Sequence, residues 1–138
     1  FSLDPTHVNY LMPHKKTYHT IIPGFLTKDN KPIGPFGVMG GYMQPQGHMQ
    51  VVTNMIDFHL NPQMALDAKR FQWIENKKFI LEPGFDENII SELKKRGHEI
   101  EIEEELAMFG RGQIIVRLEN EVYIAGCESR TDSNIACY

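Results

Sequence analysis

Two runs of β-branched and aromatic residues in the first third of the chain predict paired strands. The runs are YHTIIPGFL at residues 18–26 and IGPFGVM at residues 33–39. Residues of these types favour strands, and the turn-forming sequence KDNKP at 28–32 separates the two runs. We therefore expect a β-hairpin with a five-residue connection. An extended loop should precede it, because residues 1–16 show no sustained period and carry two prolines.

The middle of the chain places apolar residues at helical spacing. Pro45 suits the first turn of a helix, where its missing N–H costs nothing. Asn61-Pro62 has the pattern of a helix cap followed by the first helical residue, which predicts a short second helix over PQMALDAKRF. The first helix should therefore end near residue 60, with one apolar stripe formed by Met49, Val52, Met55, Ile56 and His59 or Leu60.

A third helix is predicted after the strand-like sequence KFILE at residues 78–82. Asp86 is expected to cap this helix over residues 87–96, and Gly97 suits the position just past its end. Its inward-facing residues should be Ile89, Ile90 and Leu93.

A second hairpin completes the pattern. GQIIVRL at residues 112–118 and EVYIAG at 121–126 alternate about a tight polar turn at Glu119-Asn120. Locally paired strands with helices to cover one face of a sheet make the fold class α+β. The chain of 138 residues is long enough to bury a core, so we expect residues 1–138 to form a single domain.

Composition argues against several classes of partner. The net charge is −4 and the sequence pI is about 5.8, so no nucleic acid or anionic membrane surface is expected as the main partner. No apolar run approaches the roughly 18 residues that a membrane span needs. The acidic run Glu99–Glu105 is expected to be a solvated face or an exposed strand edge. Cys127 and Cys137 make neither a disulfide framework nor a zinc motif.

The strongest chemical signal is a cluster of glycines that runs into the first helix, at positions 34, 37, 40, 41 and 47. No Gly-Lys-Ser/Thr follows, which excludes a phosphate-binding P-loop, and the spacing does not match GxGxxG. Two interpretations remain. The cluster is either a structural tight turn, or Gly40 and Gly41 form a pair of backbone donors that face an oxyanion just before a helix start.

Other polar residues give weaker signals. The six histidines match no metal-binding motif, so no metal is expected. His19 and Thr20 stand side by side in the first predicted strand. Because neighbours in a strand point to opposite faces, one of the two should lie inward or at the rim of a site.

Three segments carry a resemblance to a known family. They are YHTIIPGF at 18–25, GGYMQPQGHMQVVTNMIDFHLNPQMALDAKRFQW at 40–73 and AGCESRTDSNIACY at 125–138. Together they resemble the C-terminal part of the small subunit of γ-glutamyltranspeptidases. These are N-terminal-nucleophile hydrolases related to some cephalosporin and glutaryl acylases. The resemblance implies that the chain supplies strands and helices to a four-layer αββα sandwich.

The resemblance also implies a mechanism that needs no cofactor. In the family, self-cleavage exposes a threonine whose own amine is the base for its hydroxyl. The threonine attacks the γ-glutamyl carbonyl, and water or an acceptor amine resolves the acyl-enzyme. The family's oxyanion glycines fall on Gly40 and Gly41, and its carboxylate-binding serine pair falls on His19 and Thr20. Thr20 keeps the hydroxyl of the family's serine, whereas His19 departs from the family pattern.

The nucleophile is expected to lie upstream, since residue 1 is Phe1. The chain should then be a piece of a longer enzyme and inactive alone. Its partners would be a γ-glutamyl substrate such as glutathione and the remainder of the parent, namely the large subunit and the N-terminal part of the small subunit. Apolar surface that would meet this remainder favours a homo-oligomer of the isolated piece. Two alternatives stay open: an acylase that cleaves a glutaryl or similar side chain, and a non-catalytic domain that folds or associates.

Overall fold

The computed structural model describes residues 1–138, which form two β-sheets and three α-helices. The larger sheet has the strand order β1-β2-β6-β7, and every neighbouring pair in it is antiparallel. Its strands span β1 Gly24–Lys28, β2 Lys31–Met39, β6 Arg111–Arg117 and β7 Tyr123–Cys127. The first and last hairpins of the chain are therefore joined edge to edge.

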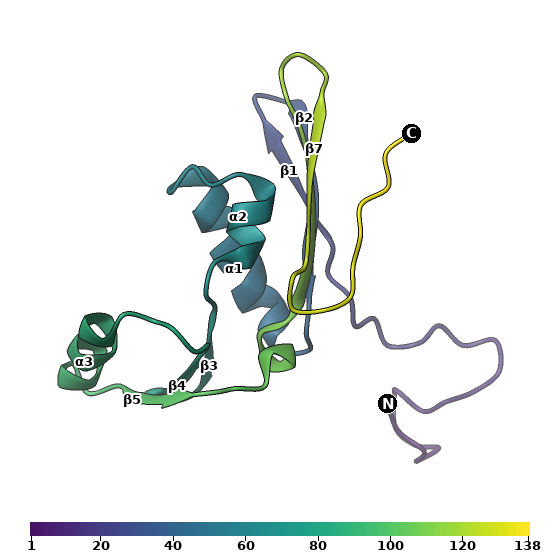
Figure 1. Cartoon of the computed structure of the whole chain (residues 1–138). Helices are drawn as coiled ribbons and strands as arrows, with labels where there is room; N and C mark the ends of the chain where they lie inside the picture. The colour runs from purple at the N-terminus through teal and green to yellow at the C-terminus, as the bar shows by residue number, and fades with distance from the viewer.

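Helices α1 (Met43–Ile56) and α2 (Pro62–Asp67) cover one face of this sheet (Figure 1). The C-terminal segment runs past the other face (Figure 1). The core lies between the helices and the sheet and consists of Val38, Val51, Ala65, Leu66 and Ile114. Each of these residues is at most 1% exposed, so burial of this apolar layer fixes α1 and α2 on the sheet.

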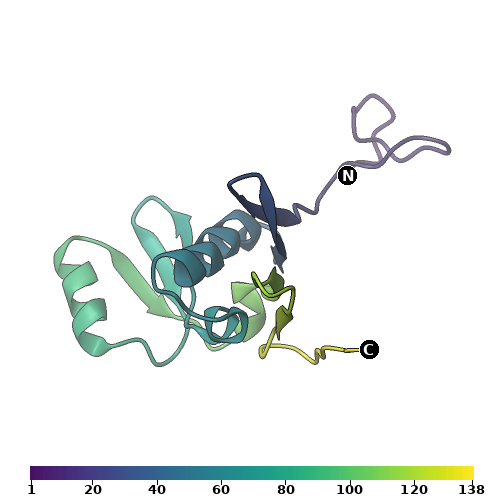
Figure 2. The same cartoon turned by 90° about the horizontal axis from the view of Figure 1, so that it is seen from above.

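The smaller sheet has three strands in the order β3-β4-β5. The strands β3 (Phe71–Glu75) and β4 (Lys78–Leu81) form an antiparallel hairpin. Helix α3 (Glu87–Lys95) then returns the chain so that β5 (Glu99–Ile102) lies parallel to β4. The short 3₁₀ helix η1 (Leu106–Phe109) leads back to β6. Viewed from above, the N-terminal segment extends away from this small sheet (Figure 2).

Several sequence predictions are confirmed. The chain has mixed α+β structure, and both predicted hairpins are present, although residues 118–122 connect the second one in place of the predicted tight turn at Glu119-Asn120. The Asn61 side chain accepts a hydrogen bond from the Met64 amide at 2.9 Å, and Asp86 accepts one from Asn88 at 2.7 Å. Gly97 follows α3 with a φ of 85°. In the acidic run, β5 is an edge strand with exposed Glu99 and Glu101.

The first hairpin differs from its prediction. Its connection has two residues rather than five, since Lys28 pairs with Lys31. Asp29 and Asn30 have φ values of 51° and 61°, and two positive φ values in succession make the tight turn that suits the twist of a hairpin. The first strand begins at Gly24 rather than at residue 18, because Pro23 has no N–H for the ladder.

The apolar stripe predicted for α1 is also wrong in part. Met49 and Ile56 are 51% and 54% exposed, and the buried side is formed by Met43, Gly47, Gln50 and Val51. Gly47 lets the helix approach β2 closely, since a Cβ there would lie 2.7 Å from the Val38 Cγ1 atom. In α3, Ile90 is buried as predicted, but Ile89 is 51% exposed. None of the helices has the length and apolar character needed to cross a membrane.

Candidate functional site

The glycine pair Gly40-Gly41 joins the end of β2 to the start of α1. The Gly40 carbonyl accepts a hydrogen bond from the Met43 amide at 2.9 Å, and the Gly41 carbonyl accepts one from Gln44 at 3.1 Å. Because the Gly40 carbonyl shares a peptide group with the Gly41 N–H, the first of these bonds fixes the direction of the Gly41 amide. The amides of Gly40 and Gly41 have no acceptor within the chain. Two adjacent, unused N–H groups just before a helix start can bind a negatively charged oxygen.

The two glycines are required for different reasons. A Cβ on Gly40 would lie 2.9 Å from the Gly110 Cα atom, so the backbone of the neighbouring segment excludes a side chain there. Gly41 has a φ of 55° and open space around its Cα atom. Its left-handed backbone favours glycine, and its free side is where a ligand could approach. Gly41 is therefore the more accessible member of the pair.

Gln44 in the first turn of α1 brings the two predicted site segments together. Its Nε2 atom donates to the Thr20 carbonyl at 2.9 Å and, more weakly, to the Gly41 carbonyl at 3.4 Å. Thr20 and His19 are exposed and lie in the irregular segment before β1. Neither side chain makes a hydrogen bond within the chain, which leaves the Thr20 hydroxyl free for a ligand.

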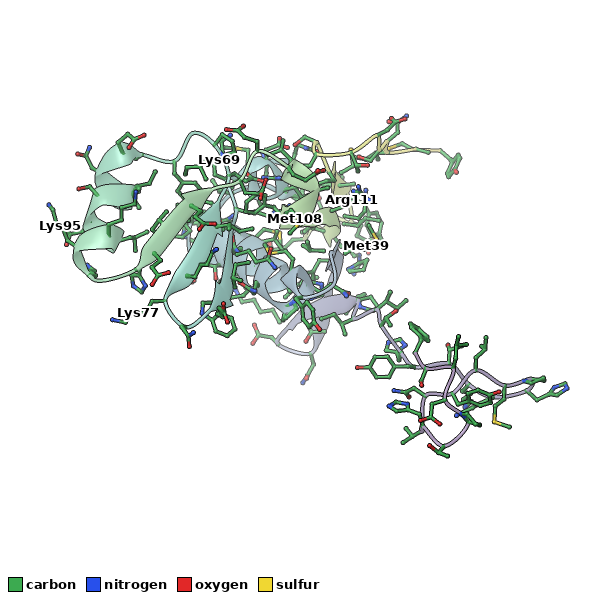
Figure 3. The ribbon with its side chains drawn as sticks, turned by 90° about the horizontal axis from the view of Figure 1, so that it is seen from below. Met39, Lys69, Lys77, Lys95, Met108 and Arg111 are labelled. Atoms are coloured by element: carbon green, nitrogen blue, oxygen red, sulfur yellow. The ribbon has the colours of Figure 1, made fainter.

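An open pocket of about 530 Å³ lies beside this pair of segments. Its lining is mainly apolar, and the polar residues in it are Gln44, His48, Arg111, Gln113 and Asn134. Met39 and Arg111 are cross-strand partners at the ends of β2 and β6 and lie next to each other in Figure 3. Burial lowers the pKa of His48, whose ring centre lies 5.1 Å from that of Phe36. His48 is therefore a neutral group at neutral pH. No group of three or more His, Cys, Asp or Glu side chains is arranged to hold a metal ion.

A cluster of four buried charged residues, which we call the charge cluster, lies behind the glycine pair. It consists of Arg70, Glu82, Glu128 and Arg130. Glu128 accepts bonds from the Arg70 guanidinium at 2.9 Å and from the Arg130 guanidinium at 2.6 Å, and Arg130 also pairs with both oxygens of Glu82. Burial lowers the pKa of Arg70, with Glu128 opposing the effect. Burial also acts to lower the pKa of Arg130, but its bonds to Glu82 and Glu128 outweigh this and raise it.

The charge cluster holds the segment that packs against Gly40. Arg70 donates to the carbonyls of Phe109 and Gly110, each at 3.0 Å, and Glu128 accepts from the Gly112 amide at 2.6 Å. Gly110 is the residue whose Cα atom blocks a side chain at Gly40. The ionic contacts therefore fix the backbone immediately behind the glycine pair.

Sequence reasoning identified neither Gln44 nor the charge cluster as part of this arrangement. Arg70 and the pair Glu128 and Arg130 fall inside the segments that carry the family resemblance, so a signal was present. Arg70 and Glu128 are 58 positions apart, and nothing in the sequence shows that they meet in the interior.

Comparison with known proteins places this chain beside enzymes that are made as proenzymes. A family model described as gamma-glutamyltranspeptidase matches residues 1–138. The glutathione hydrolase-like YwrD proenzyme of Bacillus subtilis (strain 168) is 37% identical over 107 residues, which are 74% of this chain and 20% of that protein. The chain thus spans about a fifth of the length of this relative.

Solved structures of enzymes with related names also resemble this chain. A cephalosporin acylase from Bacillus halodurans is 58% identical, with a TM-score of 0.84 over 100% of this chain and 26% of the acylase. A gamma-glutamyltranspeptidase from Pseudomonas nitroreducens complexed with L-DON shares the fold at 20% identity, with a TM-score of 0.77 over 96% of this chain and 69% of that one.

Proposed function

Because this chain belongs to the gamma-glutamyltranspeptidase family of N-terminal-nucleophile hydrolases, we propose that it is the C-terminal part of the small subunit of an enzyme that transfers or hydrolyses γ-glutamyl groups. The observation that supports this most directly is the glycine pair. Gly40 and Gly41 present two amides without acceptors at the start of α1, with their carbonyls engaged. Amides fixed in this way stabilise the negative oxygen that forms during acyl transfer.

The proposed reaction begins at a threonine upstream of this chain. Its α-amine takes the proton of its hydroxyl, and the oxygen attacks the γ-glutamyl carbonyl. The carbonyl oxygen becomes negative and accepts hydrogen bonds from Gly40 and Gly41. As the carbonyl re-forms, the leaving amine takes the proton, and an ester links the acyl group to the threonine. Water or an acceptor amine then attacks this ester.

Thr20 is proposed to bind the substrate carboxylate. Gln44 ties the Thr20 backbone to the glycine pair, so the two segments form one side of the site. The Thr20 hydroxyl has no partner within the chain and is free to donate to a carboxylate. His19 stands next to Thr20 in the chain, and its imidazole N–H can also donate a hydrogen bond to a carboxylate.

We expect the isolated 138-residue chain to be inactive. No threonine of the chain has the free α-amine that the mechanism needs, since all six are internal: Thr6, Thr17, Thr20, Thr27, Thr53 and Thr131. Adding a γ-glutamyl anilide to the isolated chain should produce neither the free aniline nor a mass increase of one acyl group. A covalent adduct detected by mass spectrometry would contradict the assignment of the nucleophile to the upstream part of the parent.

An acylase is the second candidate function, because the 58% identity to the Bacillus halodurans cephalosporin acylase extends over the whole chain. Both candidates use the glycine pair in the same way and differ in the acyl group. The deciding experiment measures kcat/KM of the parent enzyme with γ-glutamyl and glutaryl anilides. Faster turnover of the γ-glutamyl compound supports the transpeptidase function, whereas faster turnover of the glutaryl compound replaces it with the acylase.

Gly41→Val in the parent enzyme tests the role of the glycine pair. The valine side chain would fill the open space beside Gly41, and we expect kcat to fall by roughly 10²–10³, the cost of losing one oxyanion donor. Gly84→Val is the matched control, since Gly84 is also exposed with a φ of 87° and has no atom closer than 3.5 Å to an added Cβ. Equal turnover in the two variants would remove Gly41 from the site.

A further inference from the structure

Helix α1 binds the edge of the small sheet through two glutamine side chains. Gln50 donates to the Phe71 carbonyl at 2.8 Å and accepts from the Phe71 amide at 3.1 Å. Gln46 donates to the Trp73 carbonyl at 3.1 Å and accepts from the Trp73 amide at 2.7 Å. Each carboxamide thus satisfies both backbone groups of one residue on β3, the edge strand of its sheet.

The spacing of the two glutamines explains why a helix can pair with a strand here. Residues four apart on a helix are separated by about 6 Å along its axis. Alternate residues of a strand are separated by about 6.6 Å. Gln46 and Gln50 therefore match Phe71 and Trp73 in register, and their amides substitute for a neighbouring strand. The contact fixes the position of α1 along its own axis relative to β3.

In the first turn of α1, Gln46 binds both backbone groups of one partner residue, whereas Gln44 only donates, to the Thr20 and Gly41 carbonyls. Tyr42 occupies the N-cap position without a capping hydrogen bond, and no acidic residue stands in the first turn. The amides of Met43 and Gln44 in this turn donate instead to the carbonyls of Gly40 and Gly41. Gln46 lies in this first turn, and its Nε2 atom also approaches the Tyr42 carbonyl at 3.5 Å. It can hold the helix start without using the free amides.

We propose that Gln46 is a positioning residue for the reaction: by joining the first turn of α1 to Trp73, it holds the amides of Gly40 and Gly41 where the oxyanion forms. The inference rests on the proposed function of the glycine pair. Gln46 makes no contact with substrate and acts through the helix start. Misplacement of the amides weakens binding of the transition state more than binding of the substrate, so its loss should lower kcat rather than raise KM.

The test replaces Gln46 with methionine in the parent enzyme. Methionine has a similar length but cannot make the two amide bonds, and we expect kcat to fall about tenfold with KM little changed, less than the 10²–10³ loss of a whole donor. Gln63→Met is the matched control. Gln63 on α2 makes the same double contact with Cys127 on the edge strand β7, at 2.9 and 3.1 Å, without touching α1. The kcat of Gln63→Met should stay near that of the wild type.

A second variant separates positioning from general loss of stability. In Gln46→Glu, the carboxylate cannot donate to the Trp73 carbonyl, but the protonated acid can donate and accept as glutamine does. The ratio of its kcat to that of the wild type should therefore rise as the pH falls, and the same ratio for Gln63→Glu should stay flat. Equal kcat losses for Gln46→Met and Gln63→Met, or a flat ratio for Gln46→Glu, would overturn the inference.

The outcome for Gly41→Val distinguishes this inference from the proposed function. If that variant retains wild-type turnover, the oxyanion assignment fails and the role of Gln46 fails with it. If Gly41→Val loses activity while Gln46→Met behaves like Gln63→Met, the glycine pair keeps its function and Gln46 has no positioning role.

Discussion

Replacing Arg70 with methionine should destabilise the chain more than any surface substitution of similar size. Arg70 is 1% exposed and donates to Glu128 and to three carbonyls, those of Leu66, Phe109 and Gly110. In the Arg70→Met variant, the carboxylates of Glu82 and Glu128 would share one guanidinium, that of Arg130. The interior would carry an uncompensated negative charge, and the carbonyls of Phe109 and Gly110 would lose their donor, whereas the Leu66 carbonyl would keep its bond from Arg130.

The expected loss follows from these contacts. Breaking a buried ion pair by removing one partner costs about 3–5 kcal/mol, so we expect a loss of about 4 kcal/mol in the free energy of unfolding. A domain of this length unfolds with an entropy of about 0.29 kcal/mol/K, so the same loss lowers Tm by about 14 °C. With a urea m-value of about 2 kcal/mol/M, the midpoint falls by about 2 M.

Urea denaturation followed by circular dichroism measures this loss. Arg117→Met is the control, because Arg117 pairs with Glu121 at the surface and such pairs contribute about 0–1 kcal/mol. In the double variant Arg70→Met/Glu128→Gln, the buried charge is again balanced, so it should lose less than the sum of the two single variants. If Arg70→Met costs no more than Arg117→Met, the charge cluster does not hold the fold together and the reasoning fails.

Two further predictions concern the site. Thr20→Ala in the parent enzyme should raise KM with little change in kcat, because the free hydroxyl is proposed to bind the substrate carboxylate; steady-state kinetics with an unchanged KM would remove Thr20 from the site. Burial lowers the pKa of His48, so the folded chain binds this proton less readily than the unfolded chain. The stability that comes from neutral His48 is present above the ordinary histidine pKa of about 6.5 and is lost as the pH falls below it. The free energy of unfolding should therefore decrease from pH 7 to pH 5 more steeply in the wild type than in His48→Gln, and parallel curves would contradict this.

Local signals predicted the elements whose ends are fixed by their own residues. Asn61 and Asp86 cap helices through side-chain oxygens, and Gly97 ends α3 with a positive φ. Such interactions join residues only a few positions apart. The resemblance to a family further directed attention to Gly40 and Gly41, which sequence spacing alone left open between a turn and an oxyanion site.

Features that depend on contacts between residues far apart in the sequence were either not predicted or predicted wrongly. The strand β3 was not predicted, because its outer edge is satisfied by Gln46 and Gln50 and no neighbouring strand stands there. The stripe of α1 was misplaced because Gln50 is buried by its bonds to Phe71, whereas Met49 is exposed. Charged residues usually lie at the surface, so the burial of Arg70 and Glu82 could be learned only from their partners near the C-terminus.

The charge cluster also sets an order of events during synthesis of the chain. Arg70 is made 60 residues before Arg130, which at about 5–20 residues per second is an interval of roughly 3–12 s. Through most of that interval Arg70 and Glu82 lack Glu128 and Arg130, the partners that permit their burial, and β6 and β7 are made only in its last third. The apolar faces of the first hairpin and of α1 therefore stay incompletely covered until β6 and β7 have been made. The nascent chain therefore has the greatest need of a chaperone before Arg130 has been made.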